Sequence, residues 1–171
     1  MPDTTIDPSA LAILASTPAA LRALLAPMHD AALLAPVDDG WCVRDALAHI
    51  LDVEEVIYID RIARILAEDR PFIRSIDPLA RMEERGLRAH PISVLLDELD
   101  ARRPTDIAAL AALTPSQLDR TGDHDEAGEI TVNDLIHQWA YHDLMHTKQI
   151  ASMLQSPLAA RMGNTRKFYD L

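Results

Sequence analysis

Residues 131–150 read TVNDLIHQWAYHDLMHTKQI, and this stretch decides the fold. It opens with Thr131 and Asp134, which are spaced for a capping box, in which each side chain hydrogen-bonds the other's backbone N–H. Apolar residues then recur at steps of three and four, which predicts one long helix with a buried face. The predicted buried stripe consists of Val132, Leu135, Trp139, His142, His146, Gln149 and Met153.

Two histidines, His142 and His146, occupy successive positions of that stripe. Residues four apart lie one turn above each other, so both imidazoles can reach one metal ion. The alternative is a pair of core histidines that hydrogen-bond backbone or carboxylate groups. A shared metal is favoured because it satisfies both rings at once, whereas burying two unpaired imidazoles costs free energy.

Prolines mark the expected starts and breaks of the other helices. Asp7-Pro8 and Thr17-Pro18 each place an N-cap residue before a proline, so both are candidate helix starts. The N-terminal region is therefore predicted to be a short or broken helix that reaches about Leu34. A second proline effect, a kink or break, is expected at Pro104.

The remaining apolar spacing predicts helices over residues 43–66 and 92–113, separated by a long connection at 68–91 with one helical turn near 79–84. Four main helices with one long crossover predict an all-α fold, an antiparallel four-helix bundle. The length of 171 residues suits a single domain, 1–171, with its core at about 18–155.

A third metal ligand is expected from a facing helix, because metal sites in helix bundles are built from several helices. His49 lies between Ala46 and Val53 at steps of three and four, on the border of an apolar face. Taken alone, a core histidine at the edge of that face is the better interpretation of His49.

Three segments together resemble the DinB-like (DinB/YfiT) family of proposed metalloenzymes. They are WCVRDALAHI at 41–50, LDRTG at 118–122 and WAYHDLMHTKQI at 139–150, and the similarity spans about 18–153. Cys42 departs from the family pattern, which usually has a serine that caps the helix. A thiol caps poorly, so this helix start is expected to depend on Asp39 or on water.

The resemblance implies an antiparallel four-helix bundle, often a homodimer, that binds zinc or nickel through three histidines. In this sequence those positions are His49, His142 and His146. Relatives include thiol-dependent S-transferases, so the resemblance also implies a low-molecular-weight thiol as a partner of a small-molecule substrate.

Composition excludes other classes of protein. The net charge of −11 and the absence of a basic patch argue against nucleic-acid binding. Cys42 is the single cysteine, so no intramolecular disulfide can form. The first residues are acidic rather than basic, and no apolar run approaches the ~20 residues of a membrane span, so we expect a cytoplasmic protein without membrane contact.

Three histidines leave a fourth coordination position open, which is typical of catalytic rather than structural zinc sites. We therefore expect a metal-dependent transferase or hydrolase that acts on a small electrophile. The alternative is a non-enzymatic, metal-stabilised binding protein related to stress. Residues 69–90 would be the natural substrate cover, and Asp45, Asp52 and Asp143 are open candidates for hydrogen bonds to the ligand rings. The remaining histidines are expected at the surface: His29, His90, His124 and His137.

Overall fold

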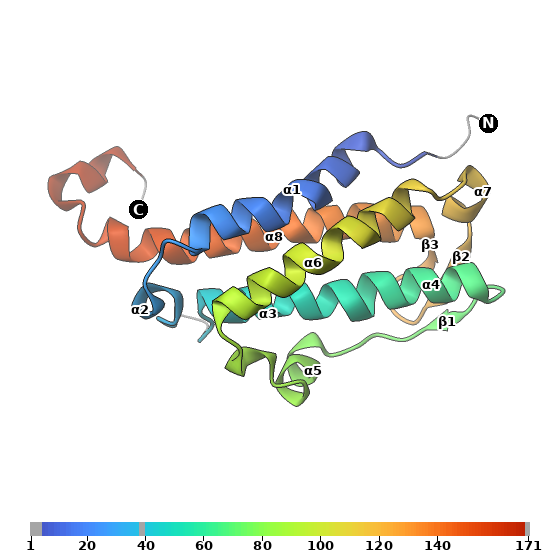
Figure 1. The fold of residues 1–171 in the computed structure, drawn as a ribbon, viewed down its shortest axis with the longest axis horizontal. Helices are drawn as coiled ribbons and strands as arrows, with labels where there is room; N and C mark the ends of the chain where they lie inside the picture. Colours follow the sequence, from blue (N-terminus) through green and yellow to red (C-terminus); the bar gives the residue numbers. More distant parts are fainter. Residues whose placement is uncertain (1–4, 38–39, 170–171) are drawn as a thin grey trace.

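The fold comes from a computed structural model that describes residues 5–37 and 40–169, with the backbone alone at 78 and 79. Four long helical segments form the bundle (Figure 1). They are α1 (Pro8–Leu25), the continuous segment made of α3 (Val43–Val53), η1 (Glu54–Ile59) and α4 (Asp60–Ala67), α6 (Ile92–Ala111) and α8 (Val132–Ala159). The all-α four-helix bundle predicted from the sequence is confirmed.

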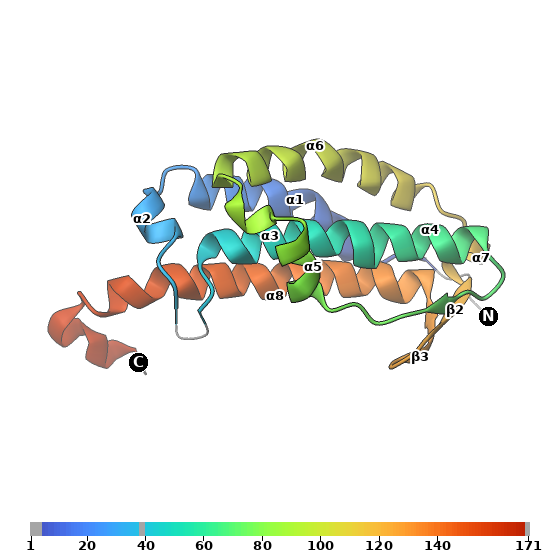
Figure 2. The same cartoon turned by 90° about the horizontal axis from the view of Figure 1, so that it is seen from below.

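The direction of the helices is less simple than an up-and-down bundle. In Figures 1 and 2, α3–α4 and α6 run one way along the bundle, whereas α1 and α8 run the other way. The antiparallel neighbours are therefore α1 with α6 and α3 with α8. The connection after α4 makes this possible, because it returns the chain along the whole bundle before α6 begins.

That connection is ordered by short elements rather than left irregular. It contains β1 (Phe72–Ile73), α5 (Pro78–Glu84) and η2 (Leu87–Ala89). Arg85 and Arg88 attach it to α3 through ion pairs of 2.7 Å with Asp52 and 2.8 Å with Asp45. The predicted helical turn is confirmed, and it forms a helix of two turns.

A small three-stranded sheet is present that the sequence did not predict. β2 (Thr121–His124) and β3 (Gly128–Thr131) form an antiparallel hairpin, and β1 pairs with β2 in parallel. The sequence did not reveal these strands because they are short and polar. Gly122 allows a close approach there, since an added Cβ would lie 3.1 Å from the backbone oxygen of Pro71.

The N-terminal helix does not restart at Thr17. It runs unbroken through Pro18, and a separate short helix, α2 (Asp30–Leu33), follows. Proline lacks the N–H that would bond the carbonyl four residues earlier, which is that of Leu14. The Arg103 guanidinium donates to this Leu14 oxygen at 3.0 Å, so a side chain from α6 replaces the missing backbone bond.

The two other predictions about helix ends gave different results. The capping box of α8 is confirmed: Thr131 Oγ1 accepts from the Asp134 N–H at 3.0 Å, and Asp134 Oδ2 accepts from the Thr131 N–H at 2.8 Å. The expected break at Pro104 is wrong, because α6 continues to Ala111. Its length is set by packing, since Leu95, Leu99 and Leu110 are buried on both sides of the proline.

By length and composition α1 could cross a membrane, contrary to the expectation that no apolar run was long enough. Helices in the core of a soluble bundle can have the same length and apolar composition. In the fold, α1 packs against α6 and α8, and Leu14, Leu21 and Leu25 are fully buried. The core accounts for part of its apolar character, since 33% of the helix is buried.

A buried ion cluster joins three of the long segments at mid-bundle. Arg103 of α6 donates to Asp143 of α8 at 2.6 Å and to Glu54 of η1 at 2.7 Å, and all three side chains are at most 1% exposed. Glu54 opens the π-helical turn η1, a wider turn that often marks functional regions of helices. The cluster holds α6 and α8 in register next to the histidines.

Candidate metal centre

The three histidines come from the two antiparallel neighbours α3 and α8. His49 lies in the second turn of α3 and is 8% exposed, deeper than its border position suggested. On α8, His146 is buried and His142 is half-buried. Most of the stripe predicted for α8 is confirmed, since Val132, Leu135, Trp139 and Met153 are also buried, whereas Gln149 is half-buried.

The structure brings the three imidazole rings together. One nitrogen from each ring lies within 4.8 Å of the other two. His49 Nε2 and His142 Nε2 are 3.3 Å apart. Two nitrogens bound to one tetrahedral zinc ion at ~2.1 Å would be about 3.4 Å apart, so this pair is already at a suitable separation.

The hydrogen bonding of the rings supports a metal rather than core histidines. His49 Nδ1 and His146 Nε2 are buried and have no hydrogen-bond partner in the described part of the chain. Gln149 Oε1 lies 2.7 Å from His146 Nδ1, so that nitrogen carries the proton and Nε2 keeps its lone pair. A divalent ion held between the rings would satisfy His146 Nε2, so the residues fit the group.

Electrostatics also favour metal binding. Burial lowers the pKa of His49 to about 4, helped by the nearby His146, and lowers that of His142 to about 3. Burial likewise lowers the pKa of His146. Neutral imidazole is the form that coordinates a metal, so the pocket keeps the three rings ready to bind at neutral pH.

Aromatic rings surround the triad. Trp41 packs edge-on against His49 with ring centroids 5.5 Å apart, and Tyr58 packs against His142 at 5.8 Å. Tyr58 in turn stacks on Trp139 at 5.3 Å. These rings limit the rotation of the imidazoles, which is how a bundle core preorganises a site.

The three aspartates near the ligands do not support the rings. Asp45 binds Arg88, Asp52 binds Arg85 and Asp143 binds Arg103. Each arginine comes from an element distant in sequence, so spacing alone could not reveal the pairing. The residue that hydrogen-bonds a histidine ring is Gln149, which the sequence analysis did not predict. Its position three residues after His146, on the same face of the helix, could have indicated this contact.

The start of α3 uses one of these aspartates. Asp45 Oδ2 accepts from the backbone N–H of Cys42 at 3.1 Å, whereas Asp39, proposed from the sequence, lies outside the described residues. Cys42 itself is buried, and burial raises the pKa of its thiol. A protonated, buried thiol is a poor nucleophile.

The other histidines lie away from the triad. His137 accepts the backbone N–H of Asp7, and His124 in β2 accepts the N–H groups of Glu126 and Ala127 at 3.2 Å. His29 and His90 are exposed, as expected. His124 and His137 are half-buried, so they are less exposed than predicted.

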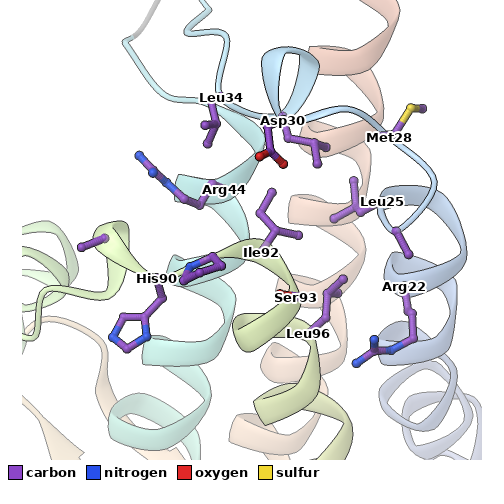
Figure 3. Close-up of a pocket in the computed structure, with 14 residues that line it drawn as sticks. Arg22, Leu25, Met28, Asp30, Leu34, Arg44, His90, Ile92, Ser93 and Leu96 are labelled. Atoms are coloured by element: carbon purple, nitrogen blue, oxygen red, sulfur yellow. The ribbon is translucent and has the colours of Figure 1, made fainter.

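Two cavities lie near the end of the bundle that holds the triad. One of about 500 Å³, lined by Arg22, Arg44 and His90 among others, opens between α1, α2, α3 and α6 (Figure 3). The other, of about 930 Å³, includes Gln149 in its wall. The second cavity is therefore the one that touches a hydrogen-bond partner of the triad.

Comparison with known proteins agrees with this geometry. Residues 13–150 match the DinB superfamily, and the chain belongs to this family of helical bundles. Curated relatives named "Putative metal-dependent hydrolase" include one from Oceanobacillus iheyensis, 29% identical over 116 residues, and one from Bacillus mycoides, 30% identical. Each alignment covers 67% of this chain and 65% of the relative, so about a third of each relative is unmatched.

A solved structure extends the similarity to almost the whole chain. YfiT from Bacillus subtilis is 27% identical and superposes with a TM-score of 0.78 over 95% of this chain and 93% of its own. It is described as a probable metal-dependent hydrolase with an unusual four-helix bundle topology. The arrangement of α1, α3–α4, α6 and α8 is thus one that a solved relative shares.

Proposed function

We propose that this chain is a metal-dependent hydrolase of small electrophilic substrates, with His49, His142 and His146 as its metal ligands. The observation that carries the proposal is the meeting of the three imidazoles, one nitrogen from each within 4.8 Å of the other two, with the buried His146 Nε2 left without a hydrogen-bond partner among the described residues. A divalent ion, zinc or nickel, would supply Lewis-acid chemistry there and keep a coordination position open to substrate.

The chain's own residues hold and shape the site. Gln149 fixes the tautomer of His146, while Trp41 and Tyr58 pack against the other two rings. Among the described residues no carboxylate is hydrogen-bonded to a triad ring, since Asp143 is committed to Arg103. The protein therefore contributes the candidate metal ligands, their orientation and an aromatic surrounding. It does not contribute a general acid–base pair hydrogen-bonded to the rings.

Thiol-dependent S-transfer to a small electrophile is the second candidate. A three-histidine site with an open position can also bind a thiolate. Cys42 is buried and its pKa is raised, so it is unsuited to supply that thiolate. A low-molecular-weight thiol would have to enter as a cosubstrate.

The experiment begins with metal analysis of protein purified without a nickel column. Zinc- and nickel-loaded protein is then assayed against small esters and amides, and against electrophiles with and without added thiols. We expect turnover that His49→Ala loses and His137→Ala keeps. Stoichiometric metal without turnover of any substrate would favour the alternative, a metal-stabilised binding protein without catalytic activity.

We also propose that the chain works as a cytoplasmic homodimer. Three large apolar side chains are exposed together on α8: Tyr141, Leu144 and Met145, at 70%, 51% and 45%. Such a patch is typical of a surface that another molecule covers. Light scattering after size exclusion tests the dimer, and a monomer at micromolar concentration would contradict it.

A further inference from the structure

The cavity of about 930 Å³ lies between the α2 region and the last turns of α8. Both elements are at the same end of the bundle in Figures 1 and 2. Ala31, Ala35 and Pro36 form one wall, and Met153 and Pro157 contribute to the other. Small apolar walls leave room for the body of a small molecule, and the volume is within the range of ligand sites.

Gln149 connects this cavity to the metal centre. Its side-chain oxygen is engaged by His146 at 2.7 Å, and the residue also lines the cavity. The amide nitrogen has no hydrogen-bond acceptor in the part of the chain that the structure describes. One residue thus holds a triad ring and keeps a donor for a polar group of a ligand.

Positive charge borders the same cavity. Arg161 lines it and, within the described ranges 5–37 and 40–169, makes no ion pair or hydrogen bond through its side chain. Most arginines of this acidic chain are paired, as Arg85, Arg88 and Arg103 show. Interaction with the carbonyl end of α8 would explain the charge of Arg161 without a ligand, but it would not explain why Arg161 lines the cavity.

We propose that this cavity is the subsite for the non-reacting part of the substrate, and that this part is apolar with a single anionic group such as a carboxylate. The apolar walls would hold the body, Arg161 would attract the anion, and Gln149 would donate to it. The assignment rests on the proposed function, because it treats the cavity as part of the metal site.

Two fluorescent probes of nearly the same shape test the charge preference. 8-Anilinonaphthalene-1-sulfonate is an apolar anion, and N-phenyl-1-naphthylamine is the same body without the sulfonate. We expect Arg161→Gln to weaken binding of the anionic probe by about 2- to 5-fold, the range of a partly exposed ion pair. Binding of the neutral probe should not change. Arg166→Gln is the matched control. An equal effect on both probes, or none on the anion, would overturn the anionic part of the proposal.

Filling the cavity tests its location. Ala35→Trp and Ser156→Trp act on opposite walls and at exposed positions, so both chains should fold. We expect each substitution to weaken the binding of both probes more than tenfold. Ala127→Trp, in the distant hairpin turn, should leave binding unchanged. Unchanged binding in both cavity variants would show that the probes, and by inference the ligand, do not use this cavity.

Coupling to the metal tests the link through Gln149. We expect the affinity for the anionic probe to differ at least twofold between zinc-loaded and apo protein, and this difference to vanish in Gln149→Leu. Equal affinities in the unmodified chain would separate the cavity from the metal site and overturn the assignment. These readouts are binding constants, so a failure to find hydrolysis would contradict the proposed function without altering them.

Discussion

At the scale of single residues, the candidate metal centre depends on which side chains share one face of α8. His146 lies on the buried face with Trp139 and Met153, whereas His137 bonds the Asn133 carbonyl at 2.7 Å, away from the triad. We expect His146→Ala to abolish stoichiometric zinc binding and His137→Ala to leave it intact. Metal content per chain is the measurement, and equal loss in both variants would contradict the assignment.

Protonation of His142 gives a second prediction, for the apo protein. Burial lowers its pKa to about 3 in the fold, against ~6.5 in the unfolded chain. Between these values the unfolded chain binds a proton that the folded chain does not, so the free energy of unfolding falls as pH drops below ~6.5. We expect a loss of roughly 1–2 kcal/mol between pH 7 and pH 5 relative to His142→Gln.

Comparison with the variant is needed because Glu54 acts in the opposite sense. Burial raises its pKa to about 7, so folding favours its protonated form and stabilises the protein as pH falls. This contribution is common to both chains and cancels in the difference. Urea unfolding at the two pH values measures it, and parallel pH profiles would show that His142 is not desolvated.

At the scale of elements, Arg103 is the residue on which α1, η1 and α8 converge. It donates to the Leu14 carbonyl that Pro18 leaves free, and to Asp143 and Glu54. We expect Arg103→Met to destabilise the fold by about 3–5 kcal/mol, because two buried carboxylates lose their cation.

The neighbouring arginine is a matched control for this prediction. Arg102 pairs with Glu55 and Glu98, and its side chain is 34% exposed. Arg102→Met should cost about 1 kcal/mol or less, as for other solvent-accessible pairs. Chemical denaturation distinguishes the two, and similar losses would mean that the buried cluster is not the stronger connection.

At the scale of the whole molecule, we expect the metal and the fold to stabilise each other. The triad joins α3 to α8, so an ion that binds only the folded chain raises its stability by mass action. Zinc at 100 times its Kd should add about 2.7 kcal/mol to the free energy of unfolding. His49→Ala should lose this gain. A thermal midpoint that rises equally in the variant would place the zinc elsewhere.

The sequence by itself determined most of the long helices and the candidate ligands that lie on them. The capping box at Thr131, the apolar stripe of α8 and the helix over 43–66 are local patterns, set by neighbours three or four residues apart. These patterns, with the family resemblance, also led to His49, His142 and His146.

Only the tertiary structure decided how those elements face one another. Three features depend on partners far away in the chain. Asp45, Asp52 and Asp143 pair with distant arginines, β1 pairs in parallel with β2, and α1 continues through Pro18 because Arg103 bonds the Leu14 carbonyl. Local pattern carries no information about such partners. The long connection between α4 and α6 sets the directions of the helices. Burial of apolar side chains over the whole bundle then selects a single arrangement, and in it Gln149, His146 and the cavity lie together.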